Sequence, residues 1–293
     1  MPAATVVLPT HDHASTLPHA LDAVQRQTVA DLEIVVVGDG VRDDTREVVA
    51  ARMREDARIR FLDRPKGERH GERHRHEALT DARGAIVCYA CDDDLWLPWH
   101  VETLRSALEG ADFAHVLPLD MDADGRALVT LFDAAHPGNR AGMERYRIGF
   151  GLASAGHTLE AYRRLPHGWR PAPPGTASDL HMWRQFMDAD ARIRTVFRPT
   201  VLHFGVPLRR EWSAERRAAE LARWSVELRG PDAELRIARL ALDGAGARYG
   251  ASTALRCELQ DWYDGVPDAG LRHLWRSNRM LRDLRRRLRR YPA

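Results

Sequence analysis

The first third of the chain contains short runs of β-branched and other apolar residues that are typical of buried strands. These runs cover residues 5–8, 33–37, 58–62 and 85–89. Each is short enough to be a strand, and each is separated from the next by a stretch with a different periodicity. The pattern therefore predicts four strands in the first part of the fold.

The segments between these runs show helical spacing. Between the first two, apolar residues fall at i, i+3, i+4 and i+7, namely Leu17, Ala20, Leu21 and Val24. Residues 45–55 and 74–82 are expected to be further helices, so strands and helices alternate along the chain. Because parallel strands are joined by right-handed crossovers, we expect an α/β fold with a doubly wound, mostly parallel sheet. Such sheets bind ligands outside the carboxyl ends of their strands.

The pattern changes twice further along the chain. A helix is expected from Pro98 to a stop at Gly110, followed by a strand over residues 113–117. From about residue 120 the spacing is looser, with a hairpin turn at residues 122–125 and a mobile loop at residues 171–175. Beyond Pro207 the sequence becomes rich in Arg, Ala, Glu and Leu at helical spacing. We therefore expect three regions: 1–120, 121–206 and 207–293.

Composition limits the possible class of protein. Hydrophobic residues make up 44% of the 293 residues, enough for one good core and a second, smaller one. No apolar run reaches the roughly 18 residues of a membrane span, and the start carries no signal-peptide pattern. We therefore expect a cytoplasmic protein, in agreement with its three cysteines. A net charge of +2 argues against a general nucleic-acid binder.

The charge is uneven at the end of the sequence. Arginines crowd residues 282–290. One interpretation is a solvated helix face packed by Leu284 and Leu288, and another is peripheral contact with an anionic membrane. Pairing of two copies through these helices is a third possibility.

Polar residues follow three of the predicted strands. The first strand ends in Pro9, Thr10, His11 and Asp12. The second ends in Gly38-Asp39-Gly40, and the fourth in Asp92-Asp93-Asp94. The strand-end rule brings these clusters together at one edge of the sheet. Adjacent carboxylates repel one another unless a cation offsets them, and a Mg²⁺ or Mn²⁺ ion would share its coordination between them, diphosphate oxygens and water.

With these motifs the sequence resembles a family 2 glycosyltransferase of the GT-A type. The family's opening pattern appears as residues 6–12, Gln27-Thr28, residues 34–37, Gly38-Asp39-Gly40 and Asp43-Asp44-Thr45. The resemblance covers residues 4–110 well and 150–205 thinly. It implies a nucleotide-diphosphate sugar donor of the UDP or dTDP type. The regions would then be a nucleotide-sugar-binding core (1–120), an acceptor-binding and catalytic-base subdomain (121–206) and a helical Arg-rich extension (207–293).

The resemblance also implies roles for single residues. The nucleoside pocket would be lined by Pro9, Thr10, Asp12 and Asp39, with Asp39 accepting a hydrogen bond from the base. Arg75 would lie near the diphosphate, although Arg69 and Arg73 compete for that role.

The metal site would be built on the acidic triplet. Alignment on Pro98 makes Asp93 the preferred metal ligand and Asp94 the second choice, while Asp92 faces the ribose or the metal. His203 follows a short strand, where some members of the family supply an imidazole to the metal or the diphosphate.

The catalytic base is expected at the start of a helix. Inverting transfer to an acceptor hydroxyl requires a base on the face opposite the leaving diphosphate, and a carboxylate suits this role. The segment beginning Ser178-Asp179 resembles the family's acidic helix start, so Asp179 is the expected base. The alternative interpretation is a helix N-cap, and the two roles are compatible.

Some positions depart from the family pattern. His11-Asp12 replaces Tyr-Asn, Gly38 replaces the first Asp of Asp-Asp-Gly, and Cys91 stands where many members carry the first Asp of Asp-x-Asp. These changes leave the nucleotide base open. A sugar nucleotidyltransferase and a catalytically inactive nucleotide-sugar-binding protein are the alternatives. The acceptor, a carbohydrate, a glycolipid or a secondary metabolite, is not encoded in these motifs.

Overall fold

The computed structural model describes residues 1–146 and 149–264. The chain separates into two compact units, residues 1–241 and 242–293. Within the second unit the structure describes a continuous helix up to Asp264. The expected Arg-rich terminal helix over residues 271–290 lies outside the described residues.

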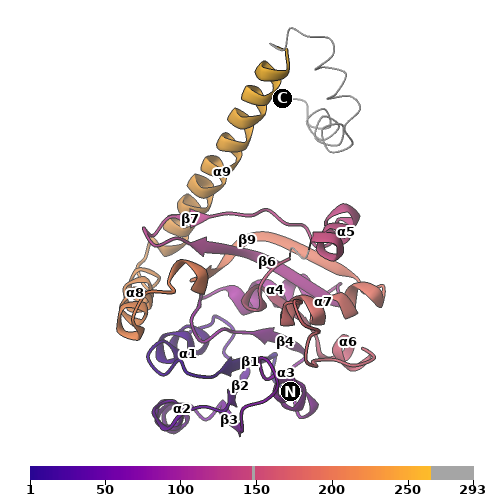
Figure 1. The fold of residues 1–293 in the computed structure, drawn as a ribbon. Helices are drawn as coiled ribbons and strands as arrows, with labels where there is room; N and C mark the ends of the chain where they lie inside the picture. Colours follow the sequence, from indigo (N-terminus) through magenta and orange to yellow (C-terminus); the bar gives the residue numbers. More distant parts are fainter. Residues whose placement is uncertain (147–148, 265–293) are drawn as a thin grey trace. The chain divides into compact units, whose positions relative to one another are not determined.

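The first unit is built on one mixed sheet (Figure 1). Its strands are β1 (Ala4–Thr10), β2 (Leu32–Asp39), β3 (Ile59–Arg64), β4 (Ile86–Tyr89), β5 (Leu95–Trp96), β6 (Phe113–Met121), β7 (Ala127–Leu128), β8 (Ala155–Thr158) and β9 (Ile193–His203). Its helices are α1 (Leu17–Gln25), α2 (Asp43–Glu55), α3 (Glu72–Thr80), α4 (His100–Leu108), α5 (Pro137–Tyr146), α6 (Leu159–Arg163), α7 (Ser178–Asp188) and α8 (Ala214–Glu227), and α9 (Ala233–Asp264) begins in this unit. The strand order is β3-β2-β1-β4-β8-β6-β9-β5, with β7 paired to β6.

The half of the sheet built by the N-terminal residues is parallel. β1 pairs in parallel with β2 on one side and with β4 on the other, and β2 pairs in parallel with β3. Alternate residues of β1 enter two separate cores, with Val6 packing with α1 on one face and Val7 packing with α3 and α7 on the other. The expected doubly wound α/β sheet is therefore confirmed. Its strand order reverses between β1 and β4, and ligands bind at such a switch point.

The other half of the sheet is mixed. β8 runs antiparallel to both β4 and β6, whereas β9 pairs in parallel with β6 and antiparallel with β5. The hairpin turn expected at residues 122–125 joins β6 to β7. Because this sheet spans residues on both sides of position 120, the division into regions at residues 120 and 206 stays a prediction.

No helix among the described residues, 1–146 and 149–264, combines the length and the apolar character that a membrane crossing requires.

Candidate functional site

The carboxyl ends of β1, β2 and β4 surround a cavity of about 270 Å³, here called the strand-end cavity. Its lining residues are Pro9, Thr10, His11, His13, Asp39, Lys66, Arg69, His70, Arg75, Cys91, Asp92, Asp93 and Leu152. The three polar clusters found in the sequence thus contribute to one site, as the strand-end rule predicts.

Most of the expected nucleoside-pocket residues line this cavity. Thr10 is buried, and its hydroxyl has no hydrogen-bond partner among the described residues. Asp12 is an exception: its carboxylate is partly exposed, lies 3.5 Å from Arg42 Nε and from His11 Nε2, and does not line the cavity. The structure therefore brings Pro9, Thr10 and Asp39 together and places Asp12 outside the cavity wall.

Asp39 is held by the loop that follows β3. Its carboxylate accepts hydrogen bonds from Lys66 Nζ at 2.7 Å and from the Gly67 amide at 2.6 Å. Burial acts to raise the pKa of Asp39, but these two donors hold it below its ordinary value. Gly71 adopts a φ of 67°, and a Cβ there would lie 2.7 Å from Asp39 Cγ, so the loop needs glycine to approach this closely. Asp39 is therefore ionised and oriented before any ligand binds.

Lys66 is a functional candidate that sequence reasoning missed. It is the only lysine in the 293-residue sequence, and it lies beside Asp39 in the wall of the strand-end cavity. Its isolation among so many arginines was a usable signal, because an ammonium group serves as a compact point charge for phosphate.

The structure separates the three arginines that compete for the diphosphate. Arg69 and Arg75 both line the strand-end cavity, whereas Arg73 is exposed and lies 3.7 Å from Glu68. The Arg75 guanidinium is buried over the Trp169 ring at 4.8 Å and donates to Ser178 Oγ at 3.2 Å. Arg69 and Arg75 are therefore better placed for an anionic ligand than Arg73.

Each carboxylate of the acidic loop, residues 92–94, has its own cationic or protonatable partner. His13 Nδ1 donates to Asp92 Oδ1 at 2.8 Å, and Arg217 Nη2 donates to Asp93 Oδ2 at 2.7 Å. The hydrogen bond to Asp92 raises the pKa of His13. Burial, followed by repulsion from the neighbouring carboxylates, raises the pKa of Asp93. Neither His13 nor Arg217 was predicted from the sequence.

Asp94 is held by the end of β9. His203 Nδ1 lies 2.9 and 3.0 Å from the two carboxylate oxygens, and the Phe204 amide donates to Oδ1 at 3.0 Å. The charge of Asp94 raises the pKa of His203 to about 9. His203 is therefore protonated at neutral pH and acts as the counter-charge of Asp94 in this arrangement.

A divalent cation fits a neighbouring group of ligands. Suitable atoms of His13, Asp92 and Asp93 all lie within 4.8 Å of one another. Carboxylate oxygens with an imidazole nitrogen suit Mn²⁺, and carboxylates with waters suit Mg²⁺. This cluster keeps the predicted ligands Asp92 and Asp93 and adds His13, whereas Asp94 and His203, which pair with each other, are not part of it. Asp94 and His203 as metal ligands therefore stay a prediction.

Asp179 lies in the first turn of α7, next to Ser178, whose hydroxyl accepts a hydrogen bond from Arg75. The N-cap of α7 is Ala177, which provides no side-chain cap, so the helix start does not use Asp179 as a cap. Burial raises the pKa of Asp179, while the charges of Arg75 and His203 act to lower it. The carboxylate therefore feels the charge of one arginine of the strand-end cavity and of the histidine that pairs with Asp94, but Asp179 lines neither cavity.

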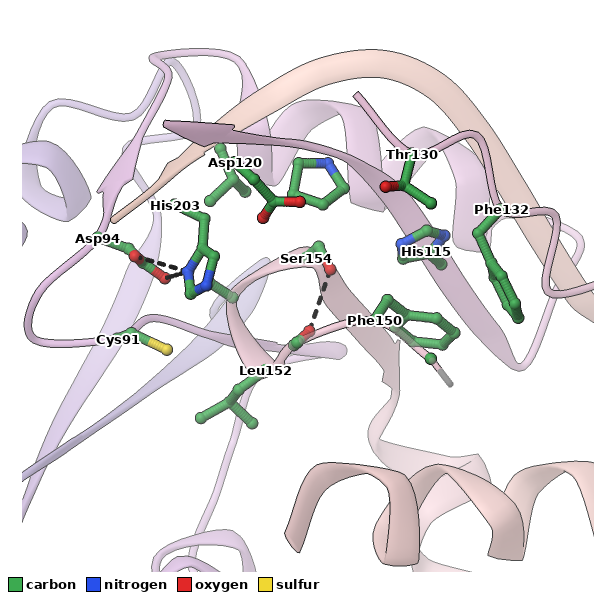
Figure 2. Close-up of a pocket in the computed structure, with 15 residues that line it drawn as sticks. Cys91, Asp94, His115, Asp120, Thr130, Phe132, Phe150, Leu152, Ser154 and His203 are labelled. Carbon is green, nitrogen blue, oxygen red and sulfur yellow. Dashed lines mark hydrogen bonds and ion pairs between the residues drawn. The ribbon is translucent and has the colours of Figure 1, made fainter. Parts of the chain in front are cut away.

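A second cavity of about 160 Å³, here called the β6 cavity, lies under β6. It shares Cys91 and Leu152 with the strand-end cavity. Figure 2 shows the Asp94–His203 pair on one side of this cavity and His115, Thr130 and Phe132 on the other. The two cavities are adjacent, so a ligand in the first can extend towards the second.

Both ring nitrogens of His115 are buried without a hydrogen-bond partner among the described residues. Burial lowers the pKa of this histidine to about 3, so the ring is neutral. It stacks against Phe150 with 4.0 Å between ring centroids. A neutral, unpaired imidazole among aromatic rings costs stability.

We therefore expect His115→Phe to stabilise the protein. An unsatisfied buried polar group costs about 1–3 kcal/mol, and the phenyl ring keeps the stacking, so the free energy of unfolding in urea should rise by about 1 kcal/mol. His100→Phe is the matched control, because the buried His100 ring pairs with Thr200 Oγ1 at 2.9 Å and its replacement should destabilise. Equal destabilisation by both substitutions would show that the nitrogens of His115 are paired.

Comparison with known proteins agrees with this geometry. Residues 5–124 match the family model described as glycosyl transferase family 2. The GalNAc(5)-diNAcBac-PP-undecaprenol beta-1,3-glucosyltransferase of Campylobacter jejuni is 33% identical over 117 residues, which are 40% of this chain and 37% of that protein. The chain thus spans little more than a third of that relative's length.

Solved structures share the fold over a longer stretch. The TarS 1-349 structure from S. aureus in complex with UDP-GlcNAc has a TM-score of 0.58 at 13% identity, covering 90% of this chain and 78% of that chain. The mannosyltransferase PcManGT from Pyrobaculum calidifontis, in complex with GDP-Man and Mn²⁺, has a TM-score of 0.51 at 17% identity, covering 94% of this chain and 88% of that chain. Residues 5–124 are thus similar to glycosyl transferase family 2, and the chain shares the fold of these solved structures.

Proposed function

We propose that the chain is a metal-dependent, inverting glycosyltransferase that uses a nucleoside-diphosphate sugar of the UDP or dTDP type. The observation that carries this proposal is the arrangement in the strand-end cavity. A carboxylate–imidazole cluster suited to a divalent cation lies in the same cavity wall as Lys66, Arg69 and Arg75. Cationic groups next to a metal site are what a diphosphate needs, because both neutralise its charge.

The donor would lie along the strand-end cavity. Asp39 would accept a hydrogen bond from the base once the Lys66 side chain moves, and Pro9 and Thr10 would form the wall beside it. Among the cavity's basic residues, Arg75 is held by Ser178 and Trp169, so its guanidinium is pre-oriented. His13, Asp92 and Asp93 would hold a Mn²⁺ or Mg²⁺ ion, which would neutralise the leaving diphosphate.

The transfer step requires a base near the sugar. Asp179 is in the lining of neither cavity, but the charges of Arg75 in the strand-end cavity and His203 in the β6 cavity both act on its carboxylate, which supports a role between them. Its carboxylate would accept the proton of the acceptor hydroxyl while that oxygen attacks the anomeric carbon and the diphosphate leaves from the opposite face. The acceptor would be a hydroxyl group of a carbohydrate, a glycolipid or a secondary metabolite.

Nucleotide binding tests this proposal directly. With Mn²⁺ or Mg²⁺ present, UDP or dTDP should raise the melting temperature of the wild-type protein, because saturation at about 100 times the dissociation constant adds about 2.7 kcal/mol. EDTA should remove most of that shift. ADP serves as the control nucleotide. The chain should also release free nucleoside diphosphate slowly from a matching sugar nucleotide, which an inactive binding protein would not do. A lack of stabilisation by UDP, dTDP and GDP alike would contradict the proposed function.

A further inference from the structure

Arg217 on helix α8 reaches the acidic loop from outside the part of the chain that matches the family. Its Nη2 donates to Asp93 Oδ2 at 2.7 Å across a sequence separation of 124 residues. Both side chains are only 16% exposed. The family match ends at residue 124, so the Arg217 side of this contact lies outside it, whereas Asp93 lies within it.

Helix α8 is anchored independently of this contact. Arg209 forms a buried ion pair with Glu220 of α8, with 2.6 Å between Nε and Oε2. On the same helix, Leu221 and Trp224 are buried. At its start, Ser15 Oγ donates to the Ala214 carbonyl at 3.4 Å. The helix backbone therefore has its own attachments, and the long Arg217 side chain is free to change partner without moving it.

The contact conflicts with the proposed metal site. Asp93 is one of the three groups that would hold a divalent cation, and His13, another of them, lies close enough to Arg217 for the guanidinium to oppose its protonation. A guanidinium on Asp93 Oδ2 competes with a cation both for the oxygen and through charge repulsion. Once a cation occupies this cluster, the guanidinium needs another anion, and the donor's diphosphate would be the one delivered to the adjoining cavity wall.

We propose that Arg217 neutralises Asp93 until a cation binds there and turns to the donor's diphosphate when metal and nucleotide bind. This inference rests on the proposed function and adds a diphosphate-binding residue to it. It gives helix α8 a direct part in donor binding.

The test is an Arg217→Met variant of the full chain, which keeps the length of the side chain and removes its charge. Mn²⁺ alone, measured by electron paramagnetic resonance without nucleotide, should bind about tenfold more tightly, because its competitor for Asp93 is gone. UDP in saturating Mn²⁺, measured by calorimetry, should bind about 10- to 100-fold more weakly, because one charge-assisted hydrogen bond to phosphate is lost. If the wild type prefers dTDP or GDP, that nucleotide replaces UDP.

The opposite signs of the two effects separate this role from a structural one. Arg216→Met is the matched control on the same helix, since Arg216 stacks on Trp212 at 3.8 Å, and it should change neither affinity. Arg217→Lys should keep part of the nucleotide affinity. A parallel fall in both affinities, or no change in either, would overturn the inference while leaving the proposed function intact. If the wild-type protein binds neither Mn²⁺ nor any of the nucleotides, both the inference about Arg217 and the proposed function are wrong.

Discussion

An Asp179→Asn variant should bind the donor as the wild type does and transfer its sugar about 10²- to 10⁴-fold more slowly, the usual contribution of a positioned acid–base group. Asparagine keeps the shape of the side chain and can still accept the Leu180 amide bond that Asp179 Oδ1 accepts at 2.8 Å. It cannot take the acceptor's proton. The turnover number and the donor affinity should be measured on the same preparation.

The pH dependence gives a second measurement of the same role. Burial raises the pKa of Asp179, so the carboxylate becomes protonated, and inactive as a base, at a higher pH than an exposed aspartate would. In the wild type the turnover number should therefore fall as the pH decreases through this raised pKa. The Asp179→Asn variant should lack that limb of the profile.

The control lies on the same helix. Asp188 is exposed at the other end of α7, and Asp188→Asn should leave transfer unchanged. Near-wild-type turnover by Asp179→Asn would contradict the assignment, as would a product that keeps the donor's anomeric configuration. The search for the base would then turn to Asp120, Asp122 or Glu160.

Substitution of Asp93 should have the second large effect. Asp93→Asn should weaken Mn²⁺-dependent nucleotide binding by at least about 100-fold, more than the loss of a residue that only supports a ligand. The reason is that the Asp93 carboxylate is one of the three ligands of the candidate cation cluster. Without it, only His13 and Asp92 would remain to hold the ion. Calorimetry with UDP, with and without EDTA, measures the metal-dependent part of the affinity.

A stability control is needed because Asp93→Asn leaves the Arg217 guanidinium without its carboxylate. The double variant Asp93→Asn with Arg217→Met removes both charges and should melt closer to the wild type than the single variant does. Its metal-dependent affinity should stay low. Recovery of that affinity in the double variant would show that Asp93 serves to neutralise Arg217 and does not hold a cation.

The parallel half of the fold could be predicted because its signals are local. β1 and β2 are buried at almost every position, so their middle parts, residues 6–8 and 34–37, form apolar runs. Polar residues stand at the carboxyl ends of these strands and of β4, so they could be predicted to meet at one edge of the sheet. The structure places Thr10, Asp39 and Asp92 in one cavity wall. By contrast, the exposed first part of β9 carries Arg194 and Arg198, so only its apolar end resembles a strand.

The partners of the acidic loop could not be predicted, because their positions depend on tertiary geometry. His13 follows β1 with no periodic signal, and its contact with Asp92 spans 79 residues. Arg216 and Arg217 are adjacent and chemically identical, and only the orientation of α8 decides which of them reaches Asp93. Sequence analysis could therefore find the carboxylates and not the groups that balance them.

The separation of these partners also has a consequence for the order in which the site forms during synthesis. His203 is made 109 residues after Asp94, and Arg217 is made 124 residues after Asp93. At about 5 to 20 residues per second, the ribosome needs roughly 5 to 20 s to cover the first of these distances. During that interval the nascent chain carries three neighbouring carboxylates, of which only Asp92 can already have its histidine. The edge of the sheet that holds the acidic loop is therefore completed late in synthesis, after the parallel strands that support it.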